Sequence, residues 1–320
     1  MKSLLQTVQK LIFALITLLV TTIPFLFTGV NEELFEFNKM LAVYLFVLLI
    51  VSLWILRMIL EKRVIFTKSF FDLPILLFLL GQILSTLFSI HQRTSIFGYY
   101  GRFHGGLFSS IAYGLLYWTT VCNLSKKQLK VVLITSVLAA LMVSLYAIPE
   151  RMGVSPSCII LRQRFDVSCW IQDVQSRVFA TFGQPNWLAA YLCALLPITV
   201  LLFLFPSKNL ALFPPEKVQR WFWLCAVALM TIALLFTKSR SGLIALIASL
   251  TLMPGGAVFL QLKNKVSKLS KLKPFAIILL AVISVILIFG SELTPSISQL
   301  INRTKHKESE SVLFEEKNLN

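Results

Sequence analysis

The chain has 320 residues, of which 57% are hydrophobic and only 14% are charged, and its formal net charge is +16. Soluble proteins carry about a quarter charged residues, so the composition excludes an ordinary soluble domain. Apolar runs of about twenty residues match the thickness of the bilayer core and predict spanning helices. In lipid, only helices and closed barrels satisfy the hydrogen bonds of their own backbone. The expected fold class is therefore all-α, a polytopic transmembrane bundle. Nucleic-acid binding is not expected despite the positive charge, because the basic residues lie in short loops.

Apolar runs in chain order predict about nine spanning helices. They cover Leu11–Thr28, Met40–Leu60, Phe71–Ile90, Leu107–Cys122, Val131–Ile148, Trp187–Phe205, Trp221–Phe236, Leu243–Leu260 and Pro274–Gly290. Residues 1–290 therefore form one membrane domain. The polar tail 291–320 is predicted to begin an external loop that the chain does not complete.

The distribution of lysines predicts the orientation of the chain. Lysine clusters occupy the amino end and every second connection, as in the run from Lys263 to Lys273. Cytoplasmic loops carry an excess of lysine and arginine, so the N-terminus is expected inside and the C-terminal tail outside.

The loops predicted to lie outside are poor in lysine but hold seven arginines: Arg93, Arg102, Arg151, Arg162, Arg164, Arg177 and Arg240. Arginine offers a planar fork of donors that suits phosphate oxygens. For Arg93, Arg151, Arg162 and Arg164 the favoured explanation is a solvated loop residue or a contact to ordinary lipid phosphates. For Lys238 and Arg240 a binding role is favoured, because charge in a short turn at membrane depth is costly unless it is paired or hydrated.

The turn before the sixth predicted span has three residues with backbone roles. Gly183 allows a positive φ, Pro185 lacks an amide donor, and Asn186 suits the N-cap of a helix beginning at Trp187. An outward helix N-terminus is also an anion site, although capping alone would explain Asn186.

The cysteines and histidines give no metal-ligand pattern, and no metal is expected. Cys158 and Cys169 share the long predicted external loop, where an oxidising compartment favours a disulfide. His91 and His104 flank the turn around Arg102, and each is either a base or an interfacial residue.

Three motifs resemble a known family when they are taken together. The first runs from Arg177 to Tyr191 as RVFATFGQPNWLAAY, the second is TKSRSG at Thr237–Gly242, and the third is GYYGRFHGGL at Gly98–Leu107. They resemble the O-antigen ligase and O-antigen polymerase superfamily of membrane proteins. The resemblance covers about Arg93 to Gly290, with a ligase-like core region at about 177–290.

The resemblance implies a glycosyltransferase at the outer face of the cytoplasmic membrane that needs neither metal nor other cofactor. Such an enzyme transfers glycan from undecaprenyl pyrophosphate to an acceptor glycan, lipid A core or protein. Arg102, Arg177 and Arg240, with Lys238, would then bind pyrophosphate, and membrane lipids would surround the bundle.

The sequence departs from the family pattern after the ninth predicted span. The family has a large external loop there with a further arginine and a catalytic histidine followed by asparagine. Arg303 could begin that loop, but His306 is followed by lysine. The catalytic residue is therefore unassigned and enzyme status stays open. The alternatives are a non-catalytic remnant or subunit, or a transporter or polymerase component for lipid-linked glycan. A transporter is expected to carry charged residues midway along its spans, and the apolar runs of this chain are almost free of them.

Overall fold

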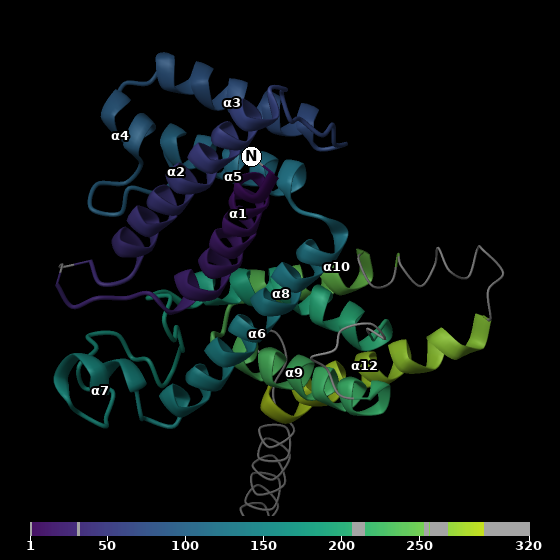
Figure 1. Cartoon of the computed structure of the whole chain (residues 1–320). Helices are drawn as coiled ribbons and strands as arrows, with labels where there is room; N and C mark the ends of the chain where they lie inside the picture. Colours follow the sequence, from purple (N-terminus) through teal and green to yellow (C-terminus); the bar gives the residue numbers. More distant parts are fainter. Residues whose placement is uncertain (1, 31–32, 207–214, 253–255, 257–267, 291–320) are drawn as a thin grey trace, which may run out of the picture. The chain divides into compact units, whose positions relative to one another are not determined.

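Figure 1 shows the computed structural model of the protein, which describes residues 2–30, 33–206, 215–252, 256 and 268–290. In these residues every regular element is a helix. The elements are α1 (Lys2–Thr22), η1 (Ile23–Phe25), α2 (Glu36–Glu61), α3 (Asp72–Leu87), α4 (Gln92–Phe97), α5 (Leu107–Asn123), α6 (Lys126–Arg151), α7 (Pro156–Arg162), α8 (Pro185–Leu204), α9 (Glu216–Phe236), α10 (Arg240–Leu250) and α12 (Lys268–Phe289). Unit 1 comprises residues 1–139 with 181–183, and unit 2 comprises residues 140–180 with 184–320.

Five helical segments in the described part of the chain are long and apolar enough to cross a bilayer. They are Ser3–Phe25, α2, α6, α8 and α9. The predicted all-helical class and several membrane-type helices are thus confirmed. Each of the nine predicted spans overlaps a helix, but four of these helices are not among the five long ones: α5 has 17 residues, and α3, α10 and the apolar part of α12 are shorter still. The predicted tail at 291–320, and most of Leu243–Leu260 beyond Thr251, lie outside the described residues.

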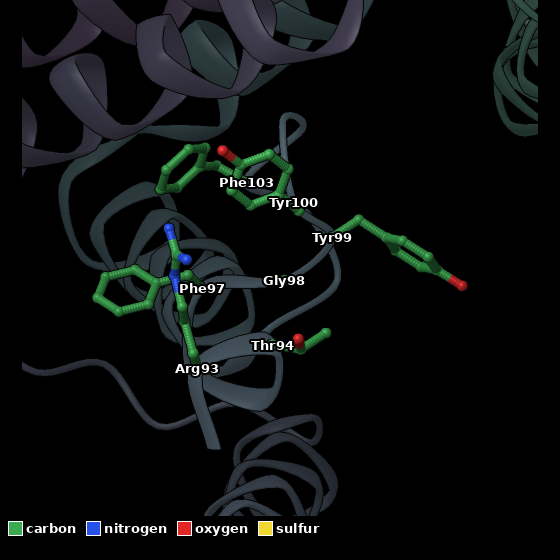
Figure 2. Close-up of a pocket in the computed structure, with 7 residues that line it drawn as sticks. All are labelled: Arg93, Thr94, Phe97, Gly98, Tyr99, Tyr100 and Phe103. Carbon is green, nitrogen blue, oxygen red and sulfur yellow. The ribbon is translucent and has the colours of Figure 1, made fainter. Parts of the chain in front are cut away.

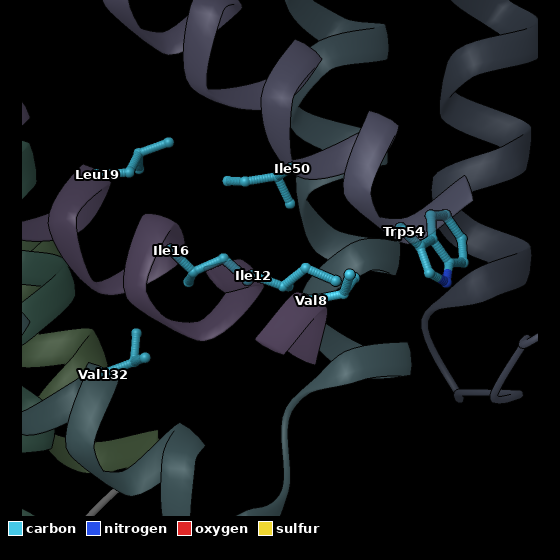
Figure 3. Close-up of a cluster of buried hydrophobic side chains, with 7 residues drawn as sticks. All are labelled: Val8, Ile12, Ile16, Leu19, Ile50, Trp54 and Val132. Carbon is cyan, nitrogen blue, oxygen red and sulfur yellow. The ribbon is translucent and has the colours of Figure 1, made fainter. Parts of the chain in front are cut away.

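The core of unit 1 forms where α1 packs against α2 (Figure 3). Its seven buried side chains are Val8, Ile12, Ile16, Leu19, Ile50, Trp54 and Val132. The four from α1 recur every three or four residues, so they share one face of the helix. Lipid tails are as apolar as these side chains, so the contact depends on close packing rather than on exclusion of water.

Helix α3 presents an apolar surface away from its neighbours. Its exposed large side chains are Leu73, Leu76, Leu77, Phe78, Leu80, Ile83, Leu84 and Leu87. At its start, Asp72 accepts hydrogen bonds from the amide of Ser69 (2.7 Å) and from Trp118 Nε1 of α5 (3.1 Å). The polar contacts fix one end of α3, and the apolar face suits contact with lipid.

In unit 2, α8 lies against both α9 and α10 (Figure 1). Three residues, 237–239, join α9 to α10. The close approach of α10 to α8 depends on Gly242, because a Cβ atom there would lie 2.8 Å from the Cβ of Ala189. Small residues let helix backbones approach in this way. Cys193 Sγ donates to the carbonyl oxygen of Gly242 at 3.0 Å, next to the same contact.

Several helices extend beyond the predicted spans. Helix α1 begins at Lys2 rather than Leu11, and α6 runs from Lys126 through Pro149 to Arg151. Apolar runs mark only the part of a helix that suits lipid, whereas a helix continues into polar residues that reach water. The region predicted as one long loop, residues 149–186, also holds the short helix α7.

Candidate anion-binding site

Arg177 is fixed between the end of α9 and the start of α8. Its Nε donates to the carbonyl oxygen of Thr237 (3.2 Å), and its Nη2 donates to Oδ1 of Asn186 (3.3 Å). The next residue, Val178, donates its amide to the carbonyl of Phe236 at 3.1 Å. The exposed guanidinium is therefore oriented by its two hydrogen bonds, and the backbone next to Arg177 is fixed by the hydrogen bond of Val178.

Two hydroxyl residues shape the turn between α9 and α10. Thr237 Oγ1 donates to the carbonyl of Leu234 (2.7 Å) and accepts from the amide of Ser239 (3.2 Å). Ser239 is the N-cap of α10, and its hydroxyl accepts from the amide of Gly242 at 3.2 Å. Between them, Lys238 adopts a left-handed backbone with φ of +49°. This turn fixes where Lys238 and Arg240 leave the backbone.

A pocket of about 500 Å³ lies beside this turn, within unit 2. The lining consists of Arg177, Asn186, Lys238, Ser239, Arg240 and Ser241. Three of the six are cations and none is acidic. Helix α10 begins at the pocket and α8 begins one residue before Asn186, so the partial positive charges of two helix N-termini add to the cationic side chains. The arrangement suits an anion with several oxygen atoms.

The expectation that Asn186 caps a helix beginning at Trp187 is wrong. Helix α8 begins at Pro185, and its N-cap is Gln184, which makes no side-chain capping bond. Proline suits the first helical position because the amide it lacks would have no partner within the helix. The side chain of Asn186 contacts Arg177 instead.

Gly183 belongs to unit 1, and the structure shows why it is glycine. Its φ is +75°, and a Cβ atom there would lie 2.5 Å from Cδ2 of Phe35. The neighbouring Thr181 donates its hydroxyl to the carbonyl of Pro24 (2.6 Å) and accepts a hydrogen bond from Nζ of Lys39. The predicted positive φ is thus present, in a segment that packs into unit 1.

Arg102 also belongs to unit 1, whereas the pocket around Arg177 is lined by unit 2 residues. Its Nε pairs with Oε2 of Glu36 at 3.3 Å. The backbone approaches itself closely in the surrounding turn, because a Cβ atom at Gly106 would lie 2.3 Å from the amide nitrogen of Gly98. The role of Arg102 as a phosphate ligand stays a prediction.

A second pocket, of about 200 Å³, lies beside this turn (Figure 2). The guanidinium of Arg93 lies 5.2 Å from the ring centroid of Tyr100, which is a cation–π distance. Tyr99 points away from both side chains in Figure 2. Arg93 thus stacks on an aromatic ring of its own turn, a contact that the sequence did not indicate.

The long loop of unit 2 carries the expected disulfide between Cys158 and Cys169. Trp170 follows it directly, and its Nε1 donates to Oγ of Ser155 at 3.0 Å. The Trp170 ring meets Phe179 edge to face, with the centroids 5.3 Å apart. The disulfide loop therefore packs against the segment that follows Arg177.

Glu150 is the residue near the site that sequence reasoning missed. Its side chain is fully buried at the end of α6, and its Oε2 accepts from the amide of Ala180 at 2.7 Å. Acidic residues at helix ends are common, so this one gave no signal by itself.

The described residues hold no group of three or more histidine, cysteine or acidic side chains placed to bind one metal ion. The site is instead a cationic pocket built on two helix N-termini. Comparison of the chain with protein-family models, with curated proteins and with solved structures gave no match.

Proposed function

We propose that the pocket of Arg177, Lys238 and Arg240 binds the pyrophosphate of a polyprenyl-linked glycan, in a membrane protein similar to the O-antigen ligases. One observation carries the proposal: three cations and two helix N-termini meet around a pocket that no acidic residue lines. A monophosphate needs fewer donors, whereas a pyrophosphate presents two groups of oxygens to a broad cationic surface. The fork of Arg177, already oriented by Asn186 and Thr237, suits bidentate recognition.

The proposed reaction is transfer of the glycan to an acceptor hydroxyl on a glycan, lipid A core or protein. The hydroxyl oxygen attacks the anomeric carbon, the bond from that carbon to the phosphate oxygen breaks, and the pyrophosphate leaves with the bonding electrons. Arg177, Lys238 and Arg240 stabilise the charge that develops on the leaving group. The base that takes the hydroxyl proton is not assigned to a residue of this chain.

The proposed topology has nine spans, with the N-terminus in the cytoplasm and the C-terminal tail outside. It is supported by the lysine clusters in alternate connections. On this topology the Arg177 turn and the Lys238–Arg240 turn both face the outer side of the cytoplasmic membrane. Undecaprenyl-pyrophosphate glycan would reach the pocket from the outer leaflet, without a metal or other cofactor.

The test is a titration of the protein in lipid nanodiscs with inorganic pyrophosphate. Arg240→Ala removes a charged donor worth about 1.5–3 kcal/mol, so the affinity should fall about ten- to a hundredfold. Arg162→Ala is the matched control, because Arg162 is exposed in α7 and does not line the pocket. Undiminished binding by Arg240→Ala would refute the pyrophosphate site.

A second assay separates transferase from non-catalytic protein. The protein is mixed with radiolabelled undecaprenyl-pyrophosphate glycan and an acceptor, and labelled acceptor is measured. Binding without transfer would favour a remnant or a subunit that needs a second chain. Movement of the labelled lipid from one leaflet of a vesicle membrane to the other, without transfer of glycan to the acceptor, would favour a transporter.

A further inference from the structure

Glu150 is a buried carboxyl group that the proposed reaction does not use. Its side chain is fully buried in unit 2, and none of the ion pairs between described residues includes it. Its partners are neutral: the backbone amides of Ala180 (2.7 Å) and Phe179, and the hydroxyl of Ser155 at 3.4 Å. Burial of a carboxyl group is costly, and here hydrogen bonds from backbone amides offset part of that cost.

That backbone is the segment directly after Arg177. Ala180 has a φ of +51°, a left-handed conformation that is unfavourable for a residue with a Cβ atom. At the other end of the segment, Val178 is fixed by its bond to the carbonyl of Phe236. Glu150 thus holds one end of a three-residue segment and α9 holds the other. Both Val178 and Ala180 are fully buried, so neither amide can turn to water instead.

We propose that Glu150 is a positioning residue for the anion pocket, acting through the amides of residues 179 and 180 to fix the backbone that carries Arg177. The inference rests on the proposed pyrophosphate site. Without the Glu150 carboxyl group, Ala180 loses the hydrogen bond that stabilises its unfavourable left-handed backbone. The segment then relaxes, and Arg177 loses its orientation toward Asn186 and Thr237.

The surroundings of Glu150 predict which substitutions keep this role. Glutamine can accept from the Ala180 amide with its carbonyl oxygen and donate to Ser155 with its amide. Ser155 already accepts from Trp170 Nε1, and its hydroxyl oxygen has a second lone pair to accept again. Aspartate keeps the charge but is one methylene shorter, so its carboxyl group cannot reach Ala180. Alanine removes the acceptor altogether.

The test compares these variants by titration with inorganic pyrophosphate in nanodiscs, at a temperature where circular dichroism shows each to be folded. Glu150→Ala should bind about tenfold more weakly, as for other residues that orient a ligand, and Glu150→Gln should stay within about threefold of the wild type. Met230→Ala is the control, because it opens a cavity at a fully buried position of α9 that contacts Thr199 of α8, and it should bind pyrophosphate as the wild type does. If Glu150→Ala does not fold, Glu150→Asp takes its place with the same expected loss.

A purely structural role would not give the next result. If Glu150 acts through Arg177, then Arg177→Ala with Glu150→Ala should bind no more weakly than Arg177→Ala alone. Wild-type affinity in Glu150→Ala or Glu150→Asp, together with weakened binding in Arg240→Ala, would overturn the positioning role and leave the pocket intact. Additive losses in the double variant would also overturn it. If the wild-type protein does not bind pyrophosphate, the proposed function itself fails.

Discussion

Substitution of Gly242 by alanine tests whether the packing of α10 on α8 builds the anion pocket. The new Cβ atom would lie 2.8 Å from Cβ of Ala189, 3.2 Å from Cβ of Ser239 and 3.3 Å from Cδ1 of Leu234. Carbon atoms pack at about 3.5–4.0 Å, so the first contact is short by about 0.7 Å or more. The Leu234 side chain can rotate away, but Ala189 sits on a helix backbone and cannot. Helix α10 must therefore move away from α8.

The expected cost has two parts that oppose each other. Overpacking of this kind destabilises by about 1–3 kcal/mol, whereas alanine favours a helix over glycine by about 1 kcal/mol. The net change in the free energy of unfolding is therefore at most about 2 kcal/mol. Anion binding should weaken as well, because separation of the two helix N-termini lowers their joint attraction for an anion. A loss of about 1 kcal/mol in binding corresponds to roughly fivefold in affinity.

The assay measures pyrophosphate affinity and thermal unfolding for Gly242→Ala, Ala189→Gly and the variant with both changes. Ala189→Gly removes the opposing Cβ atom, so the double variant should recover most of the affinity that Gly242→Ala loses. Wild-type affinity in Gly242→Ala would refute the link between this contact and the pocket. Equal losses in the single Gly242→Ala variant and the double variant would show that Ala189 is not the obstacle.

Two further predictions address the guanidinium of Arg177 and the core of unit 1. Arg177→Lys keeps the charge but loses the planar fork, whose Nε and Nη2 donate in fixed directions to Thr237 and Asn186. Pyrophosphate should therefore bind about tenfold more weakly in the same titration, and unchanged affinity would contradict a role for the planar fork. Ile12→Ala should lower the free energy of unfolding in detergent toward the lower end of about 2–5 kcal/mol, since lipid tails are as apolar as the core. Leu11→Ala, at a position 45% exposed, is its control, and an equal loss in both variants would argue against the packing shown in Figure 3.

The sequence predicted the helices of this fold better than their ends. Long apolar runs indicate helices because a backbone in lipid must satisfy its own hydrogen bonds. Helix ends depend on single residues, and Pro185 moved the start of α8 two residues ahead of Trp187. Because the helix begins at Pro185, Asn186 is not its N-cap, and the side chain of Asn186 accepts a hydrogen bond from Arg177 instead. No run of apolar residues carries that information.

The cationic residues of the pocket could be predicted, but their support could not. Lys238 and Arg240 were noticeable because charge is rare in short turns between apolar helices, and Arg177 because it is an arginine in a loop predicted to lie outside. Glu150 contacts a backbone amide thirty residues away, at Ala180. Every residue except proline offers such an amide, so nothing in the sequence marks Ala180 as the partner.

The length of α3 has a consequence for the membrane around the protein. Its 16 residues rise by about 24 Å, whereas the hydrocarbon core of a bilayer is about 30 Å thick. On the proposed topology α3 crosses the bilayer with most of its apolar side chains exposed. The hydrophobic mismatch of about 6 Å is then met by thinning of the adjacent lipid, at a modest cost for each ångström. Bilayers with shorter acyl chains relieve this cost, so the thickness of the host membrane becomes a determinant of stability along one side of unit 1.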